Sequence, residues 1–434
     1  KLYDLKTRRV SPVDITVNGD LPEVRPRFRR GARDLRAPAI SPSGARAVFE
    51  IRGEIVTVPA EKGQPRNLTS TPGVHERGPA WSPDGRSIAY FSDESGSYAL
   101  HIRSQDGLRE PRKIPLGDST AFYSGMVWSP DSRKVAYTDN RLNLWCLELD
   151  KAAPVKVDTD TYYDPLPLQL LDPAWSPDSR WIAYTRQLDN HLRAVFVYSL
   201  ETGRTHQLTD GMSDARFAVF DRNGQHLYFT ASTDVALNAG WLDLSSLDRP
   251  TSRSVYLIVL GKDQPSPLAP ESDEEKLEEK KPPEKKEAEK KAEVRIDVEN
   301  LDQRILALPI PARNYTGLWA AKSGVLFLRE GGAVSSRSLG PQTLHKFDRK
   351  TRKVEKFLDG VTRVSLSHNG EKLLYCGTGG RCAIAGTAGA PKPGEGNLNL
   401  DAVEIYVDPK AEWRQMYHEV WRIERDLFYD PNLH

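Results

Sequence analysis

The sequence has little cysteine, no excess charge of either sign and no long apolar run. It holds 3 cysteines in 434 residues, none with C-x-x-C spacing, so it is no disulfide scaffold and shows no zinc pattern. Its 61 basic and 60 acidic residues leave a net charge of +1, which offers no global field for nucleic acid or an anionic membrane. No run reaches the ~18 apolar residues of a spanning helix, and residues 1–10 do not resemble a signal peptide. These absences predict a soluble chain with no nucleic-acid partner and no membrane span.

Two of the cysteines flank a glycine-rich turn. Cys376 and Cys382 stand on either side of Gly377, Gly379 and Gly380, so a disulfide across a hairpin is geometrically conceivable. The sequence favours two thiols buried in a sheet over that bond. The compartment therefore stays open at this stage.

The main signal is internal repetition. An apolar anchor residue followed by a W-S-P-D-G type turn occurs seven times, and successive anchors lie 41, 47, 47, 45, 99 and 47 residues apart. The anchors are Ile40, Trp81, Trp128, Trp175, Phe220, Trp319 and Leu366. Apart from the 99-residue interval, this spacing is close to the ~40 to 45 residues of a four-stranded propeller blade.

Each repeat has a simple physical basis. Proline presets φ for the turn, aspartate or asparagine bonds its own backbone, and glycine takes the positive φ that leads into the next strand. Short β-branched and aromatic runs such as 88–91 and 135–137 follow the turns, as expected for strands. The sequence therefore predicts an all-β fold, a seven-bladed β-propeller whose anchor residues pack between neighbouring blades.

The ends and one interval depart from the repeat. Residues 1–30 contain strand-like pieces without a turn motif and are interpreted as the terminal strands of a preceding propeller, and residues 31–407 as the seven-bladed propeller. Within it, 265–300 is a charged insertion, interpreted as a disordered loop; partner binding by this loop is the less favoured alternative. Residues 408–434 have amphipathic helical spacing and are predicted to open a following domain.

No catalytic, metal or cofactor motif is recognisable. The sequence lacks G-x-S-x-G, H-E-x-x-H, a P-loop and G-x-G-x-x-G, so no catalytic residue, metal site or cofactor is predicted. Ser367 and His368 are adjacent, but they occupy turn positions of a repeat. Neighbouring side chains on a strand point to opposite faces, which suits proton transfer poorly.

Three repeats place an arginine four residues before the anchor: Arg36, Arg77 and Arg216. The innermost strand of each blade runs into the anchor, so these arginines are predicted near one mouth of the central channel. A guanidinium binds carboxylates in a forked geometry, which suggests attraction of the carboxylate end of peptides. An equally weighted alternative is that the arginines tether neighbouring loops.

The residues at both edges resemble a known family. Repeats of this type also occur in TolB-like propellers and in relatives of prolyl oligopeptidase, so the repeat alone is weakly specific. The combination of Val17–Asp20 and Arg25–Phe28 before the repeats with Glu412–Met416 and Arg425–Asp430 after them resembles tricorn-type peptidases. In that family a six-bladed propeller, a seven-bladed propeller, a catalytic domain, a PDZ domain and a second catalytic domain follow one another.

The resemblance implies a non-catalytic part of a serine peptidase that degrades oligopeptides. It implies that this part gates or channels peptides toward an active site whose residues lie elsewhere in the protein. It also implies partnership with the catalytic and PDZ domains, a homo-oligomer (a hexamer in the family) and a cytoplasmic setting, with a periplasmic or secreted location left open. The alternative is a TolB-like propeller that serves as a protein-binding module without proteolysis.

Overall fold

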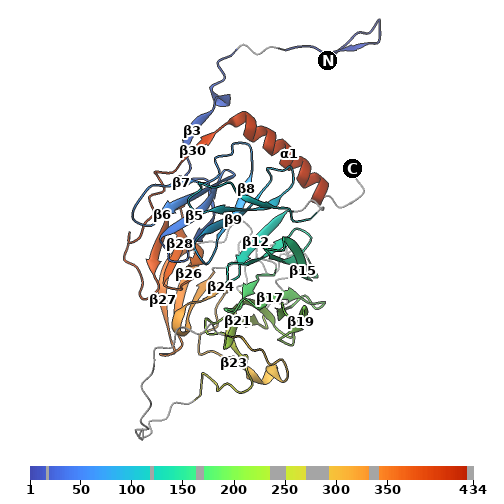
Figure 1. Cartoon of the computed structure of the whole chain (residues 1–434). Helices are drawn as coiled ribbons and strands as arrows, with labels where there is room; N and C mark the ends of the chain where they lie inside the picture. The colour runs from blue at the N-terminus through green and yellow to red at the C-terminus, as the bar shows by residue number, and fades with distance from the viewer. Residues whose placement is uncertain are drawn as a thin grey trace.

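The strands form a ring of sheets. The computed structural model describes residues 1–15, 19–117, 122–162, 171–234, 251–269, 293–331 and 342–427. Within these ranges six sheets surround a central axis, and a single α-helix lies across one end of the ring (Figure 1). The prediction of an all-β propeller with a C-terminal helix is confirmed.

Five sheets have four antiparallel strands each, paired in chain order. Sheet 1 consists of β4 (Leu35–Ile40), β5 (Arg46–Ile51), β6 (Glu54–Pro59) and β7 (Arg66–Asn67). Sheet 2 consists of β8 (Glu76–Trp81), β9 (Ser87–Ser92), β10 (Ala99–Ser104) and β11 (Arg112–Ile114). Sheet 3 consists of β12 (Tyr123–Trp128), β13 (Lys134–Asp139), β14 (Asn143–Glu148) and β15 (Ala153–Thr159). Sheet 4 consists of β16 (Ala174–Trp175), β17 (Trp181–Gln187), β18 (Arg193–Ser199) and β19 (Arg204–Gln207). Sheet 5 consists of β20 (Asp214–Phe220), β21 (His226–Ser232), β22 (Ser254–Val259) and β23 (Ile305–Ala307).

Sheet 6 is larger and corrects the predicted number of blades. It joins β24 (Tyr315–Ala320), β25 (Val325–Glu330), β26 (Gln342–Asp348), β27 (Lys353–Leu366), β28 (Lys372–Gly377) and β29 (Cys382–Gly386). The prediction of seven blades is therefore wrong, because the structure has six sheets. The reason is β27, whose 14 residues run from the sixth repeat into the seventh and pair with β26 and then with β28. Counting turn motifs cannot reveal a strand that continues between two repeats.

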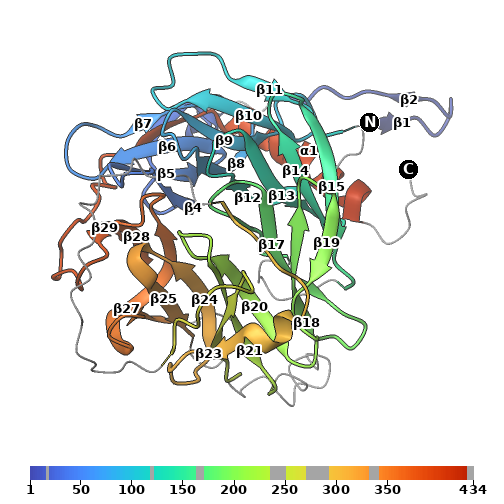
Figure 2. The same ribbon diagram turned by 60° about the horizontal axis from the view of Figure 1, so that its bottom comes forward.

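The first strand of each sheet is innermost. Strand β4 contacts β8, β8 contacts β12, and the chain of contacts continues through β16, β20 and β24, with β27 returning to β4. In Figure 2 the labelled strands β4, β8, β12, β20 and β24 lie toward the centre of the ring. The sequence placed 77–81, 124–128 and 216–220 on innermost strands, and the structure agrees.

The anchor residues pack between sheets, as predicted. Trp128 is 7% exposed, and its Nε1 donates a hydrogen bond to Ala80 O of the preceding sheet at 3.1 Å. Trp175 Nε1 donates in the same way to Val127 O at 3.0 Å. Where serine replaces the turn glycine, its hydroxyl links two turns, since Ser132 Oγ accepts a hydrogen bond from Asp84 N at 3.0 Å. The repeat thus supplies both the apolar seams between sheets and hydrogen bonds across them.

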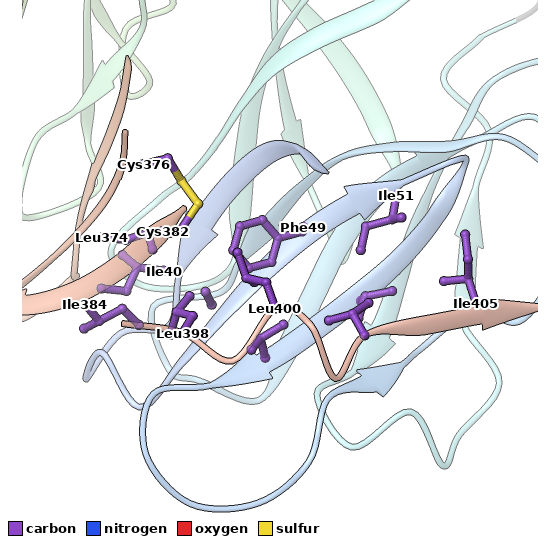
Figure 3. Packing of buried hydrophobic residues seen from close by; sticks show 14 of the residues in the cluster. Ile40, Phe49, Ile51, Leu374, Cys376, Cys382, Ile384, Leu398, Leu400 and Ile405 are labelled. Atoms are coloured by element: carbon purple, nitrogen blue, oxygen red, sulfur yellow. A yellow bond between two sulfur atoms is a disulfide. The ribbon is translucent and has the colours of Figure 1, made fainter. Parts of the chain in front are cut away.

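The ring closes where sheet 6 meets sheet 1. Phe49 and Ile51 of sheet 1 pack there with Leu374 and Ile384 of sheet 6, and with residues 398–407, in one buried cluster (Figure 3). Cys376 and Cys382 lie in this cluster and form a disulfide across β28 and β29. The sequence favoured two thiols, which is wrong. The two residues are direct cross-strand partners, a register that six residues of sequence separation did not determine.

The remaining strands form two short ribbons. Strands β1 (Leu2–Tyr3) and β2 (Val10–Ser11) pair with each other. Strand β3 (Arg27–Arg30) pairs with β30 (Glu404–Val407), which links the segment before sheet 1 to the segment after sheet 6. Short 3-10 helices occupy Pro22–Val24, Leu301–Arg304 and Lys322–Gly324.

The insertion in sheet 5 lies mostly outside the described residues, which include 265–269 and 293–300 of the predicted loop. Val294 and Ile296 are buried in a cluster between sheets 4 and 5. Val294 N also donates a hydrogen bond to Asp178 Oδ2 at 2.8 Å. The described end of the insertion is therefore held against the ring.

Helix α1 spans Pro409–Leu427. In each four-stranded sheet the W-S-P-D-G turns occupy one end of the ring. The loops that join the second and third strands, and those that lead to the next sheet, occupy the other end, which is called the loop face here. Helix α1 lies on the loop face over sheets 1 and 2 (Figure 1). In the part of the chain that the structure describes, no helix is long and apolar enough to cross a membrane.

Candidate functional site at the channel mouth

The innermost strands share a β-bulge three residues before the anchor. There the backbone has positive φ at Ala37 (44°), Gly78 (60°), Gly125 (62°) and Phe217 (59°), and strand pairing shifts register at the same places. A bulge of this kind bends a strand and redirects its side chains. Positive φ is costly for phenylalanine, so the ring imposes this geometry even where the sequence disfavours it.

Each predicted arginine directly precedes such a bulge. Arg36, Arg77 and Arg216 therefore occupy equivalent positions at the loop-face ends of β4, β8 and β20. They belong to sheets 1, 2 and 5, so they are spread around the mouth instead of forming one cluster. Their surroundings differ.

Arg36 is the exposed member. It lines a cavity of about 460 Å³ between sheet 1 and α1, and no ion pair of the described residues includes it. The cavity wall also contains charged and polar side chains from both sides: Arg33, Arg52, Glu50, His75, Glu412, Gln415 and Glu419. Arg36 can thus meet an anion that enters this cavity.

Arg77 contacts α1. Its Nη1 lies 3.7 Å from Glu419 Oε1, and its guanidinium lies 5.4 Å from the ring centroid of Tyr98. An arginine over an aromatic face gains a cation–π contact in addition to the ion pair. Arg77 thus contacts both α1 and Tyr98, and its role in attracting peptides or tethering loops stays a prediction.

Arg216 is paired within its own strand. Its Nε donates to Asp214 Oδ2 at 3.0 Å, and Arg253 Nη2 donates to the same oxygen at 2.6 Å. Burial acts to raise the pKa of Asp214, but the two guanidinium groups outweigh burial and lower it. The carboxylate is therefore charged and shared between two arginines.

Asp172 is a mouth residue that the sequence analysis missed. It stands three residues before the anchor Trp175, with φ of 46°, and so occupies the bulge position of sheet 4. Burial raises its pKa to about 6, against the opposing charges of Arg216, Arg329 and Arg193. Aligning the repeats on this position, instead of on the arginines, would have found it.

Arg329 on β25 adds another cation. Burial lowers its pKa to about 10, and the charge of Arg363 acts in the same direction. Arg329 Nη2 donates to Thr316 O at 2.8 Å. The mouth therefore carries more arginine than the three predicted positions supply.

Helix α1 is fastened to the loop face by polar contacts, which together are called the α1 joint. Arg422, 5% exposed, contacts Asp93 Oδ2 and donates to Glu419 Oε2 at 2.7 Å and to Gly96 O at 3.1 Å. Tyr98 OH donates to Glu419 Oε1 at 3.0 Å. The α1 joint therefore contains a buried, hydrogen-bonded ion pair between helix and propeller.

Two more contacts complete the joint. Arg52 donates to both oxygens of Glu412, with Nε at 3.1 Å and Nη2 at 2.5 Å. This hydrogen bond is the main cause that raises the pKa of Arg52. Gln415 Nε2 donates to Asp93 Oδ2 at 3.1 Å. A forked arginine–carboxylate pair fixes direction as well as distance, so the joint sets the orientation of α1.

The adjacent Ser367 and His368 are structural. Ser367 Oγ donates to Asn369 Oδ1 at 2.7 Å and accepts from Lys372 N at 2.9 Å, which confirms the turn interpretation. Ser367 is fully buried. Among the described residues no group of three or more His, Cys, Asp or Glu is placed to hold a metal ion.

Comparison with known proteins identifies this ring. The fold defines the class of the protein, a β-propeller with a helix mounted on one face. The family model for the tricorn protease second β-propeller domain matches residues 35–385, and the model for the tricorn protease C1 domain matches residues 409–434. The chain belongs to the tricorn protease family.

Individual relatives with similar sequences or structures are also tricorn proteases or their homologues. Tricorn protease homolog 1 of Streptomyces coelicolor is 33% identical over 231 residues, which cover 49% of this chain and 21% of the relative. Tricorn protease of Thermoplasma volcanium is 26% identical over 251 residues, which cover 55% of this chain and 22% of the relative. The crystal structure of the tricorn protease superposes with a TM-score of 0.75 over 99% of this chain and 40% of that one, at 16% identity. The chain thus spans about a fifth of the length of these curated relatives.

Proposed function

We propose that this chain is the non-catalytic propeller portion of a tricorn-like serine peptidase and that it channels oligopeptides toward the active site of that protein. The observation that carries the proposal is the cavity at the loop face, which is lined both by Arg36 of the innermost strand and by the helix that matches the C1 domain. A peptide leaving the ring here meets the segment that matches the start of a further domain. The proposal includes the homo-oligomer that the family resemblance implies.

Arg36 gives the sharpest test because it is exposed and outside the ion pairs of its neighbours. In the full-length protein, we expect Arg36→Glu to lower kcat/KM for an oligopeptide by up to about five-fold, the range for one exposed charge pair. Arg36→Lys should retain most of the activity, because the charge remains. Raising the salt concentration should shrink the difference.

The matched control is Arg109→Glu, an exposed arginine on the loop between β10 and β11 at the other end of the ring. It makes the same change in net charge away from the loop face. Equal hydrolysis rates for the two glutamate variants would contradict a role of this mouth in peptide entry.

The compartment is a separate part of the proposal. The family resemblance implies the cytoplasm, whereas the Cys376–Cys382 disulfide is of the kind that persists in oxidising compartments. We favour the oxidising compartment on this ground. Thiol alkylation of protein taken directly from cells tests it, because free thiols at both positions would return the prediction to the cytoplasm.

A further inference from the structure

Helix α1 is mounted with its polar side chains toward the propeller. Glu412, Gln415, Glu419 and Arg422 recur at intervals of three or four residues and make the contacts of the α1 joint. A surface helix ordinarily turns its apolar stripe to the body of the protein and its charges to water. Here the arrangement is the reverse.

The apolar side chains form a second stripe of α1 whose members are all exposed. At its edges Met416 and Val420 also line the loop-face cavity, and Trp421 lines a neighbouring pocket. The members of this stripe and their exposed fractions are Trp413 51%, Met416 49%, Tyr417 74%, Val420 58%, Trp421 55%, Ile423 40% and Leu427 55%. They also recur every three or four residues, so they lie along one side of the helix. This outer stripe holds two tryptophans and a tyrosine, the residue types that dominate buried interfaces.

We propose that the outer stripe is the docking surface for the rest of the C1 domain in the full-length protein. The family model for that domain matches residues 409–434 and begins at the first residue of α1. An apolar stripe of this size is rare on a free surface and marks an interface. Helix α1 is then shared: its outer stripe completes the core of the C1 domain, and its inner stripe fixes that domain to the channel mouth.

The outer stripe and the α1 joint make different kinds of contact. Apolar contact on the outer stripe is non-directional and supplies affinity, whereas the forked and buried ion pairs of the α1 joint fix orientation. At the end of the outer stripe, Arg425 lies 4.5 Å from the Trp421 ring centroid and pairs with Asp426. This polar edge bounds the apolar surface, as a rim bounds an interface core. The inference rests on family membership and not on peptide channelling.

The test compares thiol labelling in two proteins, this 434-residue chain and the full-length protein. Tyr417→Cys introduces a thiol at the most exposed position of the outer stripe; the native cysteines are a disulfide pair and the buried Cys146. We expect rapid labelling in the 434-residue chain and labelling at least tenfold slower in the full-length protein. Leu108→Cys, at a site 85% exposed on the other end of the ring, should label equally fast in both.

Three results would overturn the proposal. Equal labelling of Tyr417→Cys in both proteins would mean that nothing covers the stripe. Slow labelling in the 434-residue chain, together with sedimentation as a dimer, would mean that a second copy covers it. Protection at position 417 without protection in the companion variant Trp413→Cys, at a site 51% exposed, would mean a local contact instead of a docked domain. None of these measurements uses a peptide substrate, so their failure is separable from failure of the channelling proposal.

Discussion

The seams between sheets and the α1 joint each connect two structural elements, but they do so with different kinds of contact. At a seam, large apolar residues such as Trp128 and Tyr137 are almost fully buried. At the α1 joint the buried members are charged, with Arg422 against Asp93 and Glu419. Apolar burial gives stability in proportion to area, while a buried ion pair contributes little net stability and much geometric definition. The contacts between sheets therefore mainly stabilise the ring, whereas the α1 joint mainly fixes the orientation of α1.

The largest expected effect is at a seam. Trp128→Ala removes a buried indole and its hydrogen bond to Ala80 O. We expect the free energy of unfolding to fall by about 4 kcal/mol, as for other large core truncations. Urea unfolding followed by circular dichroism measures it.

The control for this prediction lies on α1. Trp413→Ala removes the same side chain from a position that is 51% exposed, and in this chain it should change stability by less than about 1 kcal/mol. Similar decreases in the free energy of unfolding for both variants would show that the contacts between sheets are not the main source of stability.

A smaller, local effect is expected at the α1 joint. Asp93→Asn keeps the shape of the side chain but removes the charge that pairs with Arg422. We expect α1 to detach more often, with amide hydrogen exchange in 409–427 faster by about 10-fold, or about 1.4 kcal/mol. Exchange in β13 should stay the same, because the ring does not depend on the joint.

Glu94→Gln is the matched control, since Glu94 adjoins Asp93 but its ion pairs among the described residues are with Lys113 and His101 and not with α1. It should leave exchange in α1 unchanged. If Asp93→Asn instead lowered the global free energy of unfolding as much as Trp128→Ala, the α1 joint would contribute to the stability of the ring, and the distinction between the two kinds of contact would be wrong.

A pH-dependent effect is expected from a carboxyl group inside the ring near the joint. Glu76 is 2% exposed; its Oε1 accepts a hydrogen bond from Thr71 Oγ1 at 2.7 Å, and its Oε2 has no partner among the described residues. Burial raises its pKa from 4.5 to about 9. The native state keeps the proton that the unfolded chain releases, so this group makes stability fall as pH rises from 4.5 toward 9.

Glu76→Gln removes that titration. We expect the variant to be as stable as the parent at pH 4.5 and more stable at pH 8, with a difference that grows as pH rises between these values. Thermal unfolding at the two pH values measures the difference. Glu404→Gln, at an exposed carboxylate, should show no such pH dependence, and a pH-independent gain for Glu76→Gln would assign the effect to packing instead.

The propeller fold was predictable because the repeat encodes it locally. The turn residues, the short strands and the anchors each depend on neighbours within about ten residues, and those of the five four-stranded sheets were found where expected. The number of sheets was not predictable, since β27 joins two repeats by continuing through Gly360 and not by any change in the turn motif. The disulfide was missed for a similar reason, because it depends on the register of β28 and β29.

The channel mouth was predicted only in part. The sequence placed Arg36, Arg77 and Arg216 at equivalent positions, and their attraction of peptides stays a prediction. Their partners could not be foreseen, because Glu419 lies 342 positions from Arg77 along the chain and the pair exists only once α1 is docked. Asp172 was missed because the shared feature of its position is backbone conformation and not residue type.

By itself, the sequence determined the strands, the turns, the identity of the residues between the sheets and the amphipathic helix, since each follows from local propensity and periodicity. The tertiary structure alone decided that two repeats merge into one sheet, that two cysteines are opposed across a hairpin, and that α1 turns its charged side inward. All three depend on which distant segments meet, and the sequence carries no local signal for that. The inward charges of α1 then left its apolar side exposed, which is why the outer stripe became visible only in the folded chain.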